Sequence, residues 1–214
     1  MNVPNRTAAR IAYAAAAINL LASVVMLFVL RPGLPARGDF VALRSRHAYV
    51  STHLAAWRIG WLLWNAAAVV LLAFFVVLSL RWRDRAPVVS RLALVVAGAG
   101  LAADLIAEAV LMSLAQRFPA GGYVGAEAFA ILLTGYVGNG LYTVAGILLT
   151  WAGRRDLPAL LLYVAVPVWV AGLWLAAATL GGSTTGQVLS TSVLMPMFVL
   201  WAFLVGRWLS ASES

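Results

Sequence analysis

The stretch "VVSRLALVVAGAGLAADLIAEAVLMSLA", residues 88–115, decides the fold class of this chain. It is longer than the roughly 20 apolar residues with which a helix crosses the hydrocarbon core of a bilayer. Its only acids, Asp104 and Glu108, stand four residues apart and therefore share one face of a helix. The stretch predicts a membrane-spanning helix that carries two carboxyl groups.

The composition of the whole chain indicates an integral membrane protein. Of its 214 residues, 64% are hydrophobic and 10% are charged, whereas soluble domains carry roughly 25% charged residues. We therefore predict an all-α, polytopic membrane protein that forms a single transmembrane domain over residues 1–214. Apolar segments of at least about 18 residues predict six spans, at residues 8–30, 54–80, 88–115, 126–151, 158–180 and 187–208.

Missing residue types exclude several kinds of chemistry. All 15 of the Lys and Arg residues are arginines, and the chain has no Cys and 2 His. Without Lys there is no Schiff base, and without Cys there is no thiol nucleophile or disulfide exchange. Two His without an HExxH motif make a multi-histidine zinc site unexpected. We predict no cofactor and no metal. The net charge of +8 suits contact with anionic membrane lipids and requires no nucleic acid.

The distribution of arginines predicts the orientation in the membrane, because positively charged segments resist translocation. The two termini and the second and fourth loops hold nine arginines, and the three other loops hold five. We expect a multi-pass protein of the cell inner membrane with both termini in the cytoplasm. Four of those five arginines lie in the first outward loop and reduce the asymmetry.

The extracytoplasmic loop at residues 31–53 is the longest and predicts an interfacial helix capped by Asp39. Such a helix either covers the ends of the spans or acts as a lid across the mouth of the bundle. Its apolar side would hold Phe40, Val41 and Leu43, and its basic side would turn Arg44, Arg46 and His47 toward phosphates.

The charged residues inside the spans do not balance. The predicted orientation places Asp104 near the midplane and puts Glu108, Arg58 and Glu127 in the outer half. An ionised group at mid-membrane costs roughly 2.5–3.5 kcal/mol, so such groups turn inward and pair. One arginine cannot neutralise three acids, so at least one acid should hold a proton near neutral pH. The alternative is a structural ion pair between Arg58 and the carboxyl pair.

Other polar and aromatic side chains are expected around these charges. Trp61 and Asn65 share the helix face of Arg58, and Gly135, Gly138 and Gly140 permit close helix packing or local unwinding. Each candidate has an alternative interpretation as aromatic belt, interhelical hydrogen bonding or, for Glu127, a favourable place near a helix start. The predicted ligand-binding residues are Trp57, Arg58, Trp61, Asn65, Asp104, Glu108, Glu127, Tyr136 and Asn139, and the catalytic candidates are Glu108 and Asp104.

Three functions fit this pattern. The first is binding of a small amphipathic or lipid-like molecule in a polar pocket in the outer half of the bundle. The second is a cofactor-free intramembrane enzyme that uses Glu108 or Asp104 as an acid on a lipid or isoprenoid-like substrate. The third is proton-coupled transport, for which six helices enclose only a small pathway unless the chain forms a homodimer.

Several stretches resemble a loose group of uncharacterised bacterial six-helix integral membrane proteins, a family of unknown function. The similarity lies in "RTAARIAYAAAAINLLASV" near the start, "WRIGWLLW", "DLIAEAV" and "GNGLYTVAGILL" followed by a basic turn and "LPALL". The resemblance implies the six-helix layout and carries no catalytic residue over to this chain.

Overall fold

Helices form all the secondary structure in the part of the chain that the structure describes. The structure is a computed structural model, and it describes residues 4–35, 40–117 and 120–211. The helices are α1 (Asn5–Val25), α2 (Phe40–Thr52), α3 (Leu54–Trp82), α4 (Pro87–Arg117), α5 (Ala120–Leu132), α6 (Asn139–Gly153), α7 (Ala159–Leu180) and α8 (Thr184–Ala211). Two wider, π-helical segments, η1 (Met26–Leu30) and η3 (Leu133–Gly138), continue α1 and join α5 to α6, and a 3-10 turn η2 (Arg31–Gly33) follows η1.

The predicted all-α fold with six spans is confirmed. Six helices are long and apolar enough to cross a membrane, at Asn5–Gly33, Leu54–Trp82, Pro87–Arg117, Gly122–Gly153, Ala159–Leu180 and Thr184–Ala211. The fourth is a composite of α5, η3 and α6. Together they identify a multi-pass integral membrane protein.

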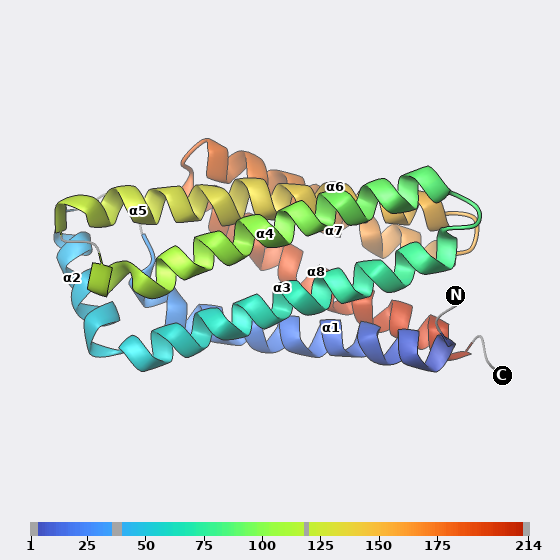
Figure 1. Ribbon diagram of the computed structural model, residues 1–214, viewed down its shortest axis with the longest axis horizontal. Coiled ribbons are helices and arrows are strands. Elements are labelled where there is room, and N and C mark those ends of the chain that lie inside the picture. The colour runs from blue at the N-terminus through green and yellow to red at the C-terminus, as the bar shows by residue number, and fades with distance from the viewer. Residues whose placement is uncertain (1–3, 36–39, 118–119, 212–214) are drawn as a thin grey trace.

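The spans lie side by side along the long axis of the molecule, and the two ends of the bundle differ (Figure 1). One end, here called the termini end, holds both chain termini and the α3–α4 and α6–α7 turns, which an ion pair between Arg85 and Asp156 joins. At the other end, the α2 end, α2 lies across the bundle (Figure 1). The loop with a predicted interfacial helix thus contains α2, while Asp39 lies outside the described residues.

The spans have unequal lengths, which creates a step at the α2 end. At 1.5 Å per residue, α4 is about 46 Å long and α7 about 33 Å. Thr179, next to the last residue of α7, packs on Gly135, where a Cβ would lie 2.7 Å from the threonine Oγ1. Beyond this level α3, α4 and α5 continue past the α7–α8 turn toward α2 (Figure 1).

Two apolar clusters form the core of the described residues, and along α4 the buried Asp104 lies between them. The larger cluster includes Ala97 of α4 and is rich in aromatic rings, such as Trp169 and Trp201 at a centroid distance of 5.1 Å. The smaller cluster, at the α2 end, includes Ala107 and Leu111 of α4. Asp104 therefore lies where the two clusters meet, and Glu108 lies one turn further on, beside Ala107 and Leu111 of the smaller cluster. We call the surroundings of these two acids the polar layer.

Candidate functional site

Asp104 occupies a tight place against the π-helical segment η3. Its side chain is buried, with 4% of the residue exposed, and its Oδ1 accepts a 2.6 Å hydrogen bond from the Thr134 hydroxyl. A Cβ on Gly138 would overlap this oxygen, so the absence of a side chain there is what admits the carboxyl group. The predicted close packing at Gly138 is therefore observed, and local widening of the helix occurs in the same segment. Such π segments are frequent at functional sites.

Glu108 lies one turn closer to the α2 end and is fully enclosed. Its exposure is 0%, and neither carboxyl oxygen has a hydrogen-bond partner among the described residues. The Tyr142 hydroxyl of α6 lies within reach of the Asp104 carboxyl group and interacts electrostatically with Glu108, yet it makes no hydrogen bond of ordinary geometry with any described residue. A buried polar group without a partner costs roughly 1–3 kcal/mol, so these atoms require an explanation.

Two side chains of α3, Trp61 and Asn65, extend the same polar layer, and two hydrogen bonds between α3 and α4 show at which level they lie. Trp57 Nε1 donates a 2.8 Å hydrogen bond to the Leu111 carbonyl, and Ser79 Oγ donates one of 3.0 Å to the Ser90 carbonyl near the other end of the helix pair. Both bonds fit one antiparallel register, which places Trp61 level with Glu108. In the same register Asn65 is level with Asp104. The Trp61 Nε1 and Asn65 Oδ1 atoms are buried and have no hydrogen-bond partner in the described part of the chain.

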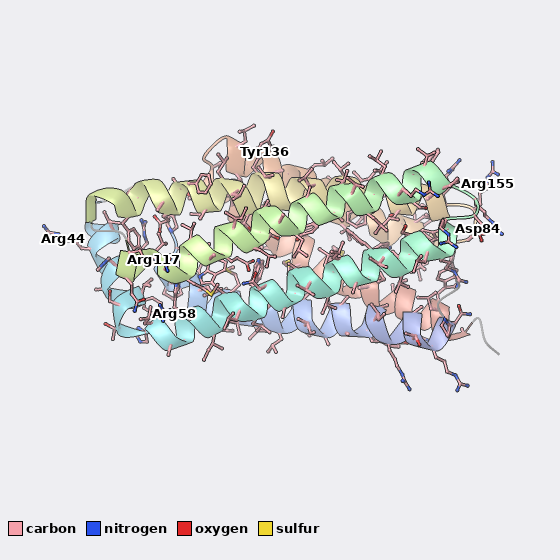
Figure 2. The ribbon with its side chains drawn as sticks, viewed as in Figure 1. Arg44, Arg58, Asp84, Arg117, Tyr136 and Arg155 are labelled. Carbon is pink, nitrogen blue, oxygen red and sulfur yellow. The ribbon has the colours of Figure 1, made fainter. Side chains whose placement is uncertain are left out.

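Arg58 does not neutralise this layer. Its guanidinium donates to Gln116 Oε1 and, at 3.4 Å, to the Met112 carbonyl, both nearer the α2 end than Glu108. Figure 2 shows Arg58 at that end of α3. The alternative interpretation, an ion pair of Arg58 with Asp104 or Glu108, is thus wrong for this conformation, because the long side chain extends along α4 toward the α2 end. Within the described ranges neither carboxyl forms an ion pair.

The third buried acid, Glu127, forms an ion pair with an arginine of α2. Its Oε2 accepts a 2.7 Å bond from Arg46 Nη2, and the two side chains are 3% and 11% exposed. The Arg46 side chain was expected to face phosphates; it instead points from α2 onto α5. Tyr123, fully buried, lies beside the pair, and its ring meets the ring of His47 at a centroid distance of 5.5 Å. We call these four residues the α2 latch.

The remaining candidates are not brought together with the carboxyl pair. Tyr136 is 40% exposed on the outside of the bundle (Figure 2). Asn139 donates a 2.8 Å bond to the Gly172 carbonyl and so joins α6 to α7, as the alternative interpretation expected. Trp57 is fully buried and engaged with α4.

Thr134, Tyr123 and Arg46 were not among the predicted site residues. The spacing of Thr134 and Gly138, four residues apart in a span, was the one available signal that both face α4. In the described part of the chain no group of three or more His, Asp or Glu residues is arranged to hold a metal ion.

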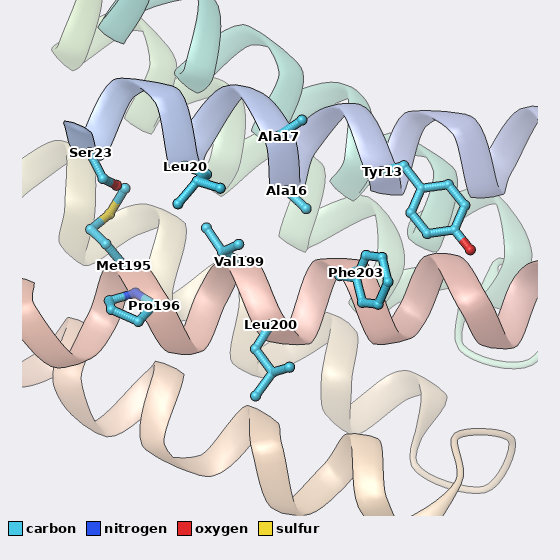
Figure 3. Close-up of a pocket in the computed structure, with 10 residues that line it drawn as sticks. All are labelled: Tyr13, Ala16, Ala17, Leu20, Ser23, Met195, Pro196, Val199, Leu200 and Phe203. Carbon is cyan, nitrogen blue, oxygen red and sulfur yellow. The ribbon is translucent and has the colours of Figure 1, made fainter. Parts of the chain in front are cut away.

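Two cavities in the described part of the chain lie away from these residues, so neither of them is the polar pocket that the sequence predicted. A groove of about 810 Å³ runs between α1 and α8 (Figure 3). It is almost wholly apolar, and Pro196, inside α8, forms part of its wall. A shallower groove of about 420 Å³ follows one face of α4. The candidate residues are packed against one another or against backbone instead.

Comparisons with models of protein families, with curated proteins and with solved structures gave no match to this chain. The resemblance to bacterial six-helix proteins therefore stays a prediction.

Proposed function

We propose that this membrane protein takes up and releases a proton at the Asp104–Glu108 pair and that the proton is the coupling ion of a transporter. The observation that carries this proposal is Glu108, which is fully buried beside a second carboxyl group and has neither an ion-pair partner nor a hydrogen-bond donor among the described residues. Two ionised carboxylates in such a place repel each other and lose their hydration. A bound proton removes one charge and supplies the missing donor.

The surroundings of the pair support reversible protonation over a purely structural role. Ionisable groups within membrane spans are costly, and those of pumps and transporters form proton relays. The hydroxyl of Tyr142, the Trp61 N–H and the Asn65 amide oxygen lie within the same layer and make no hydrogen bond to any residue that the structure describes. They offer hydrogen bonds to either protonation state after small rotations. The adjacent η3 segment, with glycines at 135 and 138, gives one wall of the site a backbone that rearranges more easily than a regular helix.

The two other predicted functions find less support in the two grooves of the described residues. An amphipathic ligand or a lipid substrate would have to reach Glu108 or Asp104, and neither groove is lined by these residues. The groove between α1 and α8 has the volume for a hydrophobic molecule, but its only polar side chains are Tyr13 and Ser23, so it gives a charged headgroup no anchor (Figure 3). Proton binding needs no such space.

Infrared titration of the purified protein tests the proposal without knowledge of the transported substrate. We expect the C=O band of a buried protonated carboxyl group to weaken as the pH is raised, and we expect Glu108→Gln to lack that component. Asp84→Asn is the matched control, because Asp84 lies in the exposed α3–α4 turn with a side-chain exposure of 80%. It removes one carboxylate and should leave the band unchanged.

The same variants then report on transport. Proteoliposomes without substrate report the uncoupled proton flux under an imposed membrane potential: it should rise with the amount of protein, and Glu108→Gln should reduce it to that of empty liposomes. A titrating band that persists in Glu108→Gln at full intensity would place the proton elsewhere and overturn the assignment.

A further inference from the structure

The exposed face of α4 carries a groove that combines an apolar wall with one cation. Its volume is about 420 Å³, and every lining residue belongs to α4: Leu105, Ile106, Ala109, Val110, Ser113 and Arg117. Leu105 and Ile106 are 42% and 55% exposed, so this face is turned away from the bundle. The acids of the same helix, Asp104 and Glu108, are buried on its opposite side.

From this arrangement we infer that an anionic phospholipid binds along α4, with its phosphate at Arg117 and an acyl chain over Leu105 and Ile106. Because α4 is one of six membrane spans, lipid covers its exposed face. Residue 117 lies twelve residues beyond residue 105, about 18 Å along the helix, which leaves room for a chain to lie beneath a headgroup. No acid lines the groove to repel a phosphate.

At the position of Arg117 a phosphate is attracted by the arginine side chain and not by the helix backbone. Arg117 is the last residue of α4, where the backbone carries the partial negative charge of a helix C-terminus and disfavours an anion. The guanidinium must overcome that field, and it has no ion-pair partner among the described residues that would compete with phosphate. Figure 2 shows Arg117 and Arg58 at the same end of the bundle. Arg58, however, is engaged with Gln116 and the Met112 carbonyl.

A phosphatidylglycerol analogue with a photoreactive acyl chain tests this site, because mass spectrometry maps the cross-linked peptide and so distinguishes α4 from other basic surfaces. We expect cross-links within residues 105–113 in liposomes, and we expect unlabelled phosphatidylglycerol to compete better than phosphatidylcholine with matched chains. Loss of one surface arginine should lower the yield about fivefold, as loss of one arginine–lipid contact predicts.

Arg117→Gln should show this loss, and Arg155→Gln should not. Arg155 is the matched control because it is an exposed arginine at the termini end (Figure 2). Equal yields in both variants, or equal competition by the two lipids, would show that the α4 face is ordinary lipid-exposed surface and would overturn the inference. Both variants change exposed residues, so a folding defect does not confuse the comparison.

Discussion

Two regions of the bundle enclose carboxyl groups, and they treat the charge in opposite ways. In the α2 latch, Glu127 accepts a 2.7 Å hydrogen bond from Arg46, so one cation neutralises one acid. In the polar layer, two acids share a place without any ion pair within the described residues. Burial alone therefore does not indicate the role of an acid; the presence or absence of a partner charge does.

The elements that supply the partners explain the difference. The latch joins a span to α2, which lies across the end of the bundle and has an arginine to contribute. The polar layer is built only from the spans α3, α4, η3 and α6, which present a hydroxyl, an amide, an indole and a phenol. The ion pair of the latch fixes α2 on α5, whereas the unpaired carboxyl groups of the polar layer can bind a proton.

Breaking the latch should produce the largest loss of stability. Arg46→Ala leaves the Glu127 carboxylate buried and unpaired, and removal of one partner from a buried ion pair costs about 3–5 kcal/mol. Glu108→Gln removes a charge that has no partner, so its free energy of unfolding should change by less than about 1 kcal/mol or increase. Reversible unfolding of both variants in mixed micelles measures the contrast.

The double variant Arg46→Gln with Glu127→Gln is the control for the latch. It removes both charges and preserves approximate volumes, so it should recover most of the stability that Arg46→Ala loses. Equal destabilisation by Glu108→Gln and Arg46→Ala would mean that the two regions do not differ in the way proposed here.

Gly138→Ala should have an intermediate effect confined to the polar layer. The added Cβ would overlap Asp104 Oδ1, and strain of this kind typically costs about 1–3 kcal/mol. Gly140→Ala is the matched control two residues away, where the new Cβ would lie 3.7 Å from the Cβ of Ala176 in ordinary contact. This control should be neutral or stabilising by about 0.5–1 kcal/mol, because alanine favours helix over glycine.

The infrared carboxyl band separates packing from function in that pair of variants. Gly138→Ala should alter the band, because it displaces the Asp104 carboxyl group, while Gly140→Ala leaves it as in the wild type. An unchanged band in Gly138→Ala would show that the carboxyl group moves aside without a change in its hydrogen bonding.

The spans and the burial of the acids could be predicted from sequence, because both follow from local patterns. Hydropathy over about 20 residues identifies a span, and a spacing of four places Asp104 and Glu108 on one helix face. Their partners could not be predicted in this way. The contact between Arg46 and Glu127 joins residues 81 positions apart, and it depends on where a loop helix comes to rest.

The predicted pocket also shows that hydrogen-bond partners could not be predicted from sequence. Trp57 and Asn139 are residue types that are common in ligand sites. Each side chain instead donates its N–H group to a backbone carbonyl of a neighbouring helix, Trp57 to Leu111 and Asn139 to Gly172. Sequence gives the donor and not the acceptor that satisfies it. A polar residue in a span is therefore assigned to packing or to function only when the acceptor is known.

Arg58→Ala should have the smallest effect and sharpens the comparison most directly. The guanidinium is half-buried and bonds Gln116 and the Met112 carbonyl, so its loss should cost less than about 1 kcal/mol. The carboxyl band should stay unchanged, because Arg58 extends away from the polar layer. A band that shifts in Arg58→Ala as it does in Glu108→Gln would show that the guanidinium reaches the pair within the membrane. The polar layer would then contain an ion pair like that of the latch, and the absence of a partner charge would no longer support proton binding there.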